Sequence, residues 1–77
     1  MKFRGIYKEF TLGWTHTFQP DNGSGLFRAR TGEFTNSHAE QLKNQEGKKC
    51  EFEYAENGHF AGWVGIQITS KDILFLN

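Results

Sequence analysis

Strict alternation of apolar and polar residues is the feature of this sequence that most limits its fold. The alternation fills two runs, whose apolar positions are Cys50, Phe52, Tyr54, Val64, Ile66 and Ile68. Side chains of a strand point in turn to its two faces, so a period of two predicts strands with one buried face. Between the runs lies Asn57-Gly58, a pair typical of a tight turn. Residues 49–68 are therefore predicted to form a β-hairpin in which Cys50 is a small buried apolar residue.

The first half of the chain predicts three more strands. Aromatic and β-branched side chains, which favour extended backbone, are frequent in residues 2–10 and 14–18, and residues 26–30 follow as the third strand. Leu12-Gly13 marks a bend, and residues 19–25 collect nearly every turn-forming residue type. A short closing strand is expected at 73–76. The side chains expected in the core are Ile6, Phe18, Phe52, Tyr54, Val64, Ile66 and Ile68.

One segment favours a helix. Ser37 and Glu40 have the spacing of a capping box, and Gly47 is placed to follow a helix C-terminus. At most one short helical turn is expected near residues 37–43. Short strands with one such turn between the third and the fourth predict an all-β fold, a small closed five-stranded antiparallel barrel, because closure leaves no unpaired strand edge. A chain of 77 residues has room for a single core, so residues 1–77 are expected to form one domain.

Charge and cysteine content limit the partners and the compartment. Nine Lys and Arg residues balance nine Asp and Glu residues, so the chain lacks the positive excess of a strongly basic nucleic-acid-binding domain. Single-strand binding is still allowed, because stacking of bases on aromatic side chains contributes much of its affinity. The single cysteine excludes an intramolecular disulfide and favours the reducing cytoplasm. No run approaches the ~18 apolar residues of a membrane span, so no membrane association is expected.

Five segments resemble, in the same order, parts of one known domain family. They are residues 5–10, 13–16, 20–24, 26–27 and 47–54. The last segment, Gly-Lys-Lys-Cys-Glu-Phe-Glu-Tyr, closely resembles the family's Gly-Gln-x-Val-x-Phe-Glu-Val. On these segments, within residues 3–68, the chain resembles a cold-shock domain, the small nucleic-acid-binding variant of the OB barrel. The resemblance implies an OB-like barrel that binds single-stranded RNA or DNA with little sequence specificity.

The resemblance also implies an interface on the second and third strands. In the cold-shock family these strands carry an exposed aromatic platform on which bases stack, and Trp14, His16 and Phe27 fall at platform positions. From spacing alone, Trp14 and His16 are expected to share a strand face, with arginines nearby that suit phosphate contact. The alternative is that Trp14 and Phe27 belong to the core. The expected binding residues, including a lysine that matches a backbone-contacting position, are Lys8, Trp14, His16, Phe27, Arg28 and Arg30.

Several departures from the cold-shock pattern favour a second function. Glu9 replaces a stacking tryptophan, and Ala29 and Arg30 replace a histidine and a phenylalanine of the platform. The alternative function is a non-enzymatic adaptor or inhibitor that binds a protein, of a size often encoded by phages or mobile elements. Its contacts are expected from loop aromatics, which form hot spots in interfaces, namely Phe34, Phe60 and Trp63. A cap over one end of the barrel is the other interpretation of these three residues.

No enzyme, cofactor or metal site is expected, and the chain is expected to be a monomer. The sequence has no nucleophile elbow, phosphate-binding glycine loop or triad pattern, and so small a domain rarely holds a pocket that excludes water. Its three histidines and Cys50 lack the spacing of a compact metal site. Three basic residues of the first strand stand at even-numbered positions and are therefore expected on one face, namely Lys2, Arg4 and Lys8. They predict either a basic stripe or an ordinary solvated strand face.

Overall fold

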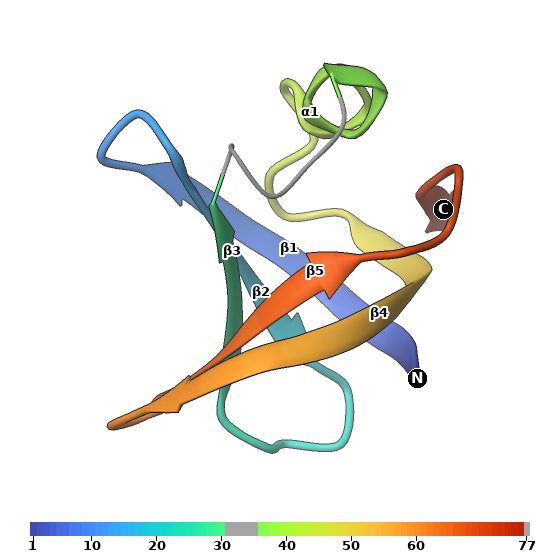
Figure 1. Ribbon diagram of the computed structural model, residues 1–77. Coiled ribbons are helices and arrows are strands. Elements are labelled where there is room, and N and C mark those ends of the chain that lie inside the picture. Colours follow the sequence, from blue (N-terminus) through green and yellow to red (C-terminus); the bar gives the residue numbers. More distant parts are fainter. Residues whose placement is uncertain (31–35, 77) are drawn as a thin grey trace.

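Figure 1 shows the computed structural model of the chain, which describes residues 1–30 and 36–76. The described residues form six strands and one helix. In chain order the elements are β1 (Lys2–Thr11), β2 (Thr15–Pro20), β3 (Leu26–Arg30), α1 (Asn36–Leu42), β4 (Lys49–Phe60), β5 (Trp63–Ile68) and β6 (Leu74–Leu76). The strands predicted from the sequence are confirmed, with small shifts at their ends.

Five of the strands close into a barrel. Their order is β1-β2-β3-β5-β4, and pairing between β1 and β4 completes the ring. All neighbouring strands run antiparallel except β3 and β5, so the closed barrel is confirmed but is mixed rather than antiparallel. The reason is connectivity, because α1 and β4 lie between β3 and β5 in sequence and let β5 return in the direction of β3. Strand β6 pairs with residues 49–51 of β4.

The hairpin predicted at residues 49–68 is present, but its turn lies elsewhere. The turn is Ala61-Gly62, where Gly62 adopts a φ of 83°. Asn57-Gly58 lies within β4, and the β4–β5 register shifts there, which makes a β-bulge. The strands stay paired beyond the bulge because the rings of Phe60 and Trp63 stack across the ladder, with centroids 4.3 Å apart.

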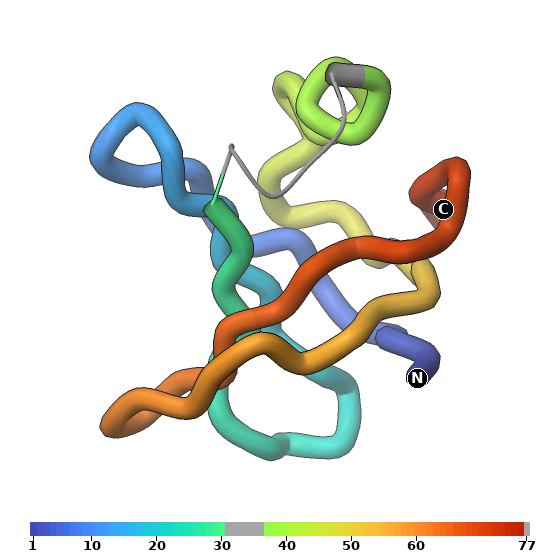
Figure 2. Tube along the Cα trace, viewed as in Figure 1, coloured from blue at the N-terminus to red at the C-terminus, as the bar shows by residue number. Residues whose placement is uncertain are grey.

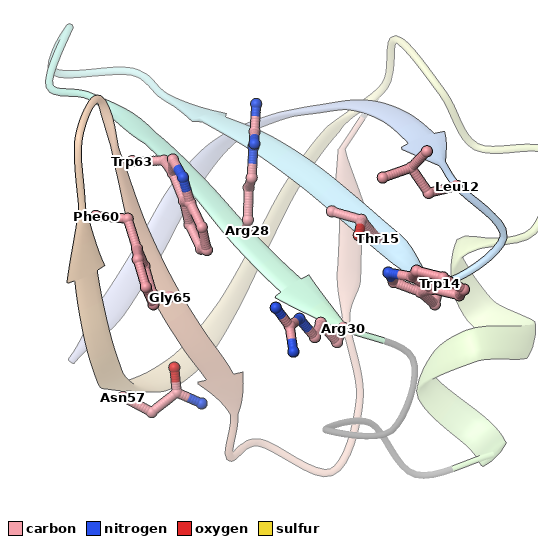
Figure 3. Close-up of a pocket in the computed structure, with 9 residues that line it drawn as sticks. All are labelled: Leu12, Trp14, Thr15, Arg28, Arg30, Asn57, Phe60, Trp63 and Gly65. Atoms are coloured by element: carbon pink, nitrogen blue, oxygen red, sulfur yellow. The ribbon is translucent and has the colours of Figure 1, made fainter.

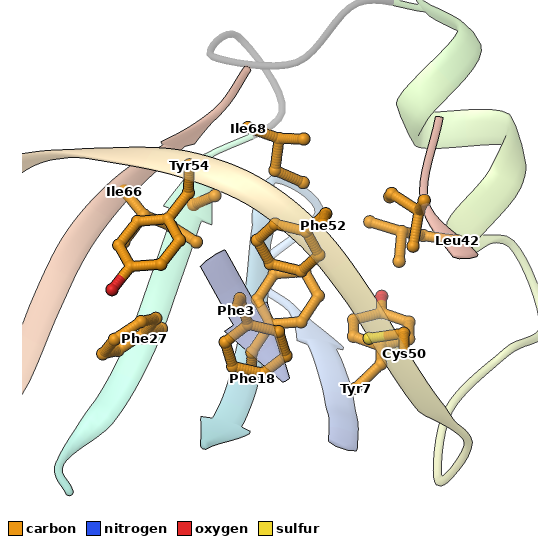
Figure 4. Packing of buried hydrophobic residues seen from close by; sticks show 12 residues of the cluster. Phe3, Tyr7, Phe18, Phe27, Leu42, Cys50, Phe52, Tyr54, Ile66 and Ile68 are labelled. Carbon is orange, nitrogen blue, oxygen red and sulfur yellow. The ribbon is translucent and has the colours of Figure 1, made fainter. Parts of the chain in front are cut away.

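An aromatic cluster fills the barrel (Figure 4). Phe52 packs among other rings, with its centroid 4.6 Å from that of Phe3 and 5.0 Å from that of Phe18. Burial confirms the predictions for Cys50, Phe18, Phe52, Tyr54, Ile66 and Ile68. Two predicted core residues, Ile6 and Val64, are only half-buried. Phe27 is buried, as the alternative core interpretation of this residue predicted, whereas Trp14 is exposed. Sequence reasoning did not predict the buried positions of Phe3, Tyr7, Ala29, Leu42 and Ile73.

Gly5 decides which face of β1 points into the barrel. A Cβ atom at this position would collide with the backbone oxygen of Gln19 and lie 2.7 Å from the ring of Phe3. Glycine therefore allows β1 to approach β2 closely here. With Gly5 inside, Phe3 and Tyr7 share the buried face, and Ile6 falls on the opposite, outward parity.

The helix α1 lies at one end of the barrel (Figure 1), where Leu42 joins the core cluster. It has seven residues, about two turns, and it confirms the short helical segment predicted near residues 37–43. Ser37 lies inside the helix rather than at its cap, and its Oγ accepts a hydrogen bond of 3.0 Å from Gln41 Nε2. Within the described part of the chain, no helix has the length and apolar character needed to cross a membrane.

Candidate nucleic-acid interface

The register of the barrel places two arginines side by side on the outer face of β3. Strand β3 alternates in burial, with Phe27 and Ala29 buried. Arg28 and Arg30 therefore point outward. Arg30 lies opposite Thr15 of β2, and Arg28 lies opposite Gly65 of β5. The outer surface of β2, β3 and β5 thus carries two positive charges, and the residues paired with the two arginines there have small side chains or none.

A groove of about 440 Å³ crosses this outer surface (Figure 3). One wall comes from the β1–β2 turn, where Leu12 and Trp14 are exposed, and the other from the end of the β4–β5 hairpin. Figure 2 shows both segments projecting to the left of the view, with β3 between them. Of the described residues, those that line the groove include no acidic side chain, and they are Leu12, Trp14, Thr15, Arg28, Arg30, Asn57, Phe60, Trp63 and Gly65.

The hairpin wall is a stack of three side chains. The rings of Phe60 and Trp63 are nearly parallel, with an interplanar angle of 15° and centroids 4.3 Å apart. The guanidinium carbon of Arg28 lies over the Trp63 ring, 5.3 Å from its centroid. Figure 3 shows Trp63 between the other two. Because these contacts hold the side chains in place before any ligand arrives, binding here loses less conformational entropy.

The opposite wall depends on an unusual turn. Leu12 and Gly13 both adopt positive φ angles, 59° and 74°, and the backbone N–H of Trp14 donates a hydrogen bond of 3.3 Å to the carbonyl of Thr11. Glycine accepts this conformation readily, whereas a leucine in it is strained by about 1–2 kcal/mol. Leu12 is nevertheless 76% exposed and Trp14 is 55% exposed. A strained turn therefore presents two large apolar side chains to solvent beside the arginines.

Two expected platform residues lie inside the barrel, which corrects their predicted placement. His16 is 5% exposed and Phe27 is 9% exposed. Strand β2 begins at Thr15, so alternation places His16 on the buried face, while Trp14 stays in the preceding turn and does not share that face. His16 Nδ1 lies 2.8 Å from the hydroxyl oxygen of Tyr7, and burial lowers the pKa of His16 to about 4. Buried rings offer no stacking surface, so neither residue belongs to the groove.

The basic residues of β1 lie away from the groove. Lys8 is exposed at a bulge where the β1–β2 register shifts, so it does not continue the parity of Lys2 and Arg4. Lys2 Nζ and Arg4 Nε lie 3.1 Å and 3.0 Å from the carboxylate oxygens of Glu51. The hydrogen bond from Lys2 is the main cause that lowers the pKa of Glu51. These two cations therefore form ion pairs on the β1–β4 surface.

The structure joins two groups that sequence reasoning kept apart. Phe60 and Trp63 line the same groove as Trp14 and the two arginines. The sequence signal for this was that Phe60 and Trp63 occupy facing positions at the paired ends of β4 and β5. The turn predicted at Asn57-Gly58 placed Phe60 in a loop, so this pairing was missed. Phe34, the third loop aromatic, lies outside the described residues. Within the described ranges, no group of three or more His, Cys, Asp and Glu residues is placed to hold a metal ion.

Comparisons with known proteins assign no family or function to this groove. No protein-family model, no curated protein and no solved structure matches the chain. A functional assignment must therefore rest on the groove itself, on its aromatic walls and on the charge of its floor.

Proposed function

We propose that the protein binds single-stranded RNA or DNA in the groove between the β1–β2 turn and the β4–β5 hairpin. The observation that carries this proposal is the combination of exposed aromatic side chains on both walls with two arginines on the floor. Strand order β1-β2-β3-β5-β4 with a helix between β3 and β4 is compatible with an OB-like barrel of cold-shock type. We propose no catalytic activity and no cofactor.

Stacking would come from the walls of the groove, and positive charge would come from its floor. Trp14 and Phe60 offer exposed ring surface, and stacking of one base on an aromatic ring stabilises a complex by about 1–3 kcal/mol. Arg28 and Arg30 suit the phosphates between such bases, because the guanidinium fork matches phosphate oxygens. In a duplex the faces of the bases are already stacked on each other, so the aromatic walls favour single strands.

Titration with single-stranded oligonucleotides tests the proposal. Trp14 and Trp63 both line the groove, so oligo-dT and oligo-U should quench tryptophan fluorescence at low salt. Trp14→Ala and Phe60→Ala should each weaken binding by about 1–3 kcal/mol. Phe10→Ala is the matched control, because Phe10 is a similarly exposed phenylalanine that does not line the groove. The absence of wild-type binding even at about 20 mM salt would refute the proposal.

The salt dependence of binding tests the floor. Arg30→Ala should weaken binding most at low salt, and the loss should shrink as salt rises, because phosphate contacts release counterions. The slope of log affinity against log salt should fall by about one unit. An unchanged slope would show that Arg30 contacts no phosphate.

A second candidate function is binding of a protein partner. The observation that favours it is the apolar tip of the β1–β2 hairpin, where Phe10, Leu12 and Trp14 are 44%, 76% and 55% exposed. Large exposed apolar side chains at a hairpin tip resemble an interface hot spot. This function becomes the better one if no single strand binds, and Leu12→Asp is then the variant that should abolish capture of the partner.

A further inference from the structure

The side chain of Asn57 enters the groove because of the bulge in β4. Glu56 pairs with Ile66 and Gly58 pairs with Gly65, so Asn57 has no opposite residue in the β4–β5 ladder. A bulge turns the side chain of its extra residue away from the regular alternation. Asn57 lines the groove together with Arg30 and lies beside the hairpin wall (Figure 3).

Gly65 leaves the space in which the Asn57 carboxamide lies. A Cβ atom at position 65 would lie 2.7 Å from Asn57 Oδ1, closer than side chains normally approach. Gly65 is also buried, between Arg28 on one neighbouring strand and Gly58 on the other. The carboxamide oxygen therefore rests over β5, and Figure 3 shows the amide nitrogen on the side where Arg30 lies.

The polar groups that face the groove are mainly hydrogen-bond donors. A guanidinium group only donates, and the Asn57 amide nitrogen also donates. The described lining residues include no carboxylate that would accept a hydrogen bond from a base. A base edge that offers two adjacent acceptors fits this arrangement. Guanine does so with O6 and N7, whereas adenine presents an amino donor in place of O6.

We infer that the amide nitrogen of Asn57 recognises the O6 and N7 edge of a guanine while Arg30 contacts a phosphate beside it, so that the groove prefers guanine to adenine at one nucleotide position. This inference rests on the proposed single-strand binding. Asn57 acts as the specificity-determining residue, and Gly65 is a positioning residue that leaves room for it. Stacking on the aromatic walls would not distinguish the two purines, because both present similar ring surfaces.

The test compares two oligonucleotides of about nine nucleotides, within the site size of an OB fold. Both are oligo-dT with one central purine, guanine in one and adenine in the other. Wild-type protein should bind the guanine strand about tenfold more tightly. Asn57→Asp, which replaces the amide donor with an acceptor, should remove the preference or shift it toward adenine.

Two further variants separate specificity from charge and from folding. Asn22→Asp is the charge control, because it adds the same negative charge in the β2–β3 loop, outside the groove, and should leave the purine preference unchanged. Gly65→Ala should fold, since the new methyl group meets chiefly the flexible end of Asn57 and needs no positive φ. It should displace that side chain and reduce the guanine preference several-fold.

The possible outcomes are distinguishable. Equal binding of the two strands by wild type would overturn the guanine inference and leave single-strand binding intact. A guanine preference that survives in Asn57→Asp would show that Asn57 does not read the base. If wild type binds neither strand nor oligo-dT, the proposed function itself fails, and the inference about guanine fails with it.

Discussion

Mild acid should destabilise the barrel through His16. The imidazole is 5% exposed, and its burial is the main cause that lowers the pKa of His16 from 6.5 to about 4, with the Glu46 carboxylate opposing the shift. In the unfolded chain the same group titrates near its ordinary pKa. Between these two pKa values the unfolded chain binds more protons than the folded protein. The free energy of unfolding must therefore fall as the pH falls through this window.

The size of the effect follows from the two pKa values of His16. A difference from 6.5 to about 4 corresponds to about 3 kcal/mol when it is fully expressed. About 2 kcal/mol of this should be lost between about pH 7.5 and about pH 5, because the unfolded chain is then almost fully protonated at this position. Domains have total stabilities of only about 5–15 kcal/mol, so the loss is large enough to measure.

Urea unfolding of wild type and His16→Asn at several pH values checks this prediction. Asparagine keeps a polar group near the position of Nδ1, which lies 2.8 Å from the Tyr7 hydroxyl oxygen in wild type. The variant should lose stability overall, but it should lack the decrease between about pH 7.5 and about pH 5 that wild type shows. Parallel curves for the two proteins would refute the reasoning, as would an imidazole that titrates near pH 6.5 in the folded state by NMR.

Three further predictions concern the core, the cysteine and the groove. Phe52→Ala should lower the free energy of unfolding in urea by about 3–5 kcal/mol, because Phe52 is 3% exposed; a loss below about 1 kcal/mol would contradict its central place. Burial raises the pKa of Cys50 to about 12, so its thiol should react with a thiol reagent only after unfolding, and rapid reaction in the folded state would contradict this. Glu9 lies opposite Thr17 of β2, and Thr17 lies opposite Arg28 of β3, so the three residues form one row across the outer face. Glu9→Trp should therefore strengthen oligo-dT binding, measured by fluorescence anisotropy. An unchanged affinity would place position 9 outside the interface.

Alternation predicted most of the fold because it reports directly on which side chains are buried. It located the strands, the β4–β5 hairpin and much of the core from Phe18 to Ile68. It could not predict the inward face of β1, which depends on how closely β1 passes Gln19 of β2 at Gly5. It also could not predict the parallel pairing of β3 with β5, because strand order depends on contacts between residues far apart in sequence.

The candidate site was harder to predict because local signals were ambiguous. Asn57-Gly58 suits a tight turn or a bulge equally well, and the stacking of Phe60 on Trp63 selects the bulge. The resemblance to cold-shock domains assigned His16 to an exposed platform, although the start of β2 at Thr15 places it inside. Arg28 and Arg30 were expected from the sequence as arginines that flank the aromatic residues, and their alternate positions on β3 place both on the outer face.

The geometry of a small barrel explains why stacking and charge come from different segments here. Only every second residue of a strand faces outward, and β3 gives these positions to Arg28 and Arg30 while Phe27 joins the core. Exposed ring surface must then come from the ends of hairpins, where alternation stops, and the groove uses Trp14 and Phe60 in this way. Because the rings are uncharged and the arginines carry the positive charge, removal of a ring should change affinity without changing the salt slope, and removal of an arginine should change both.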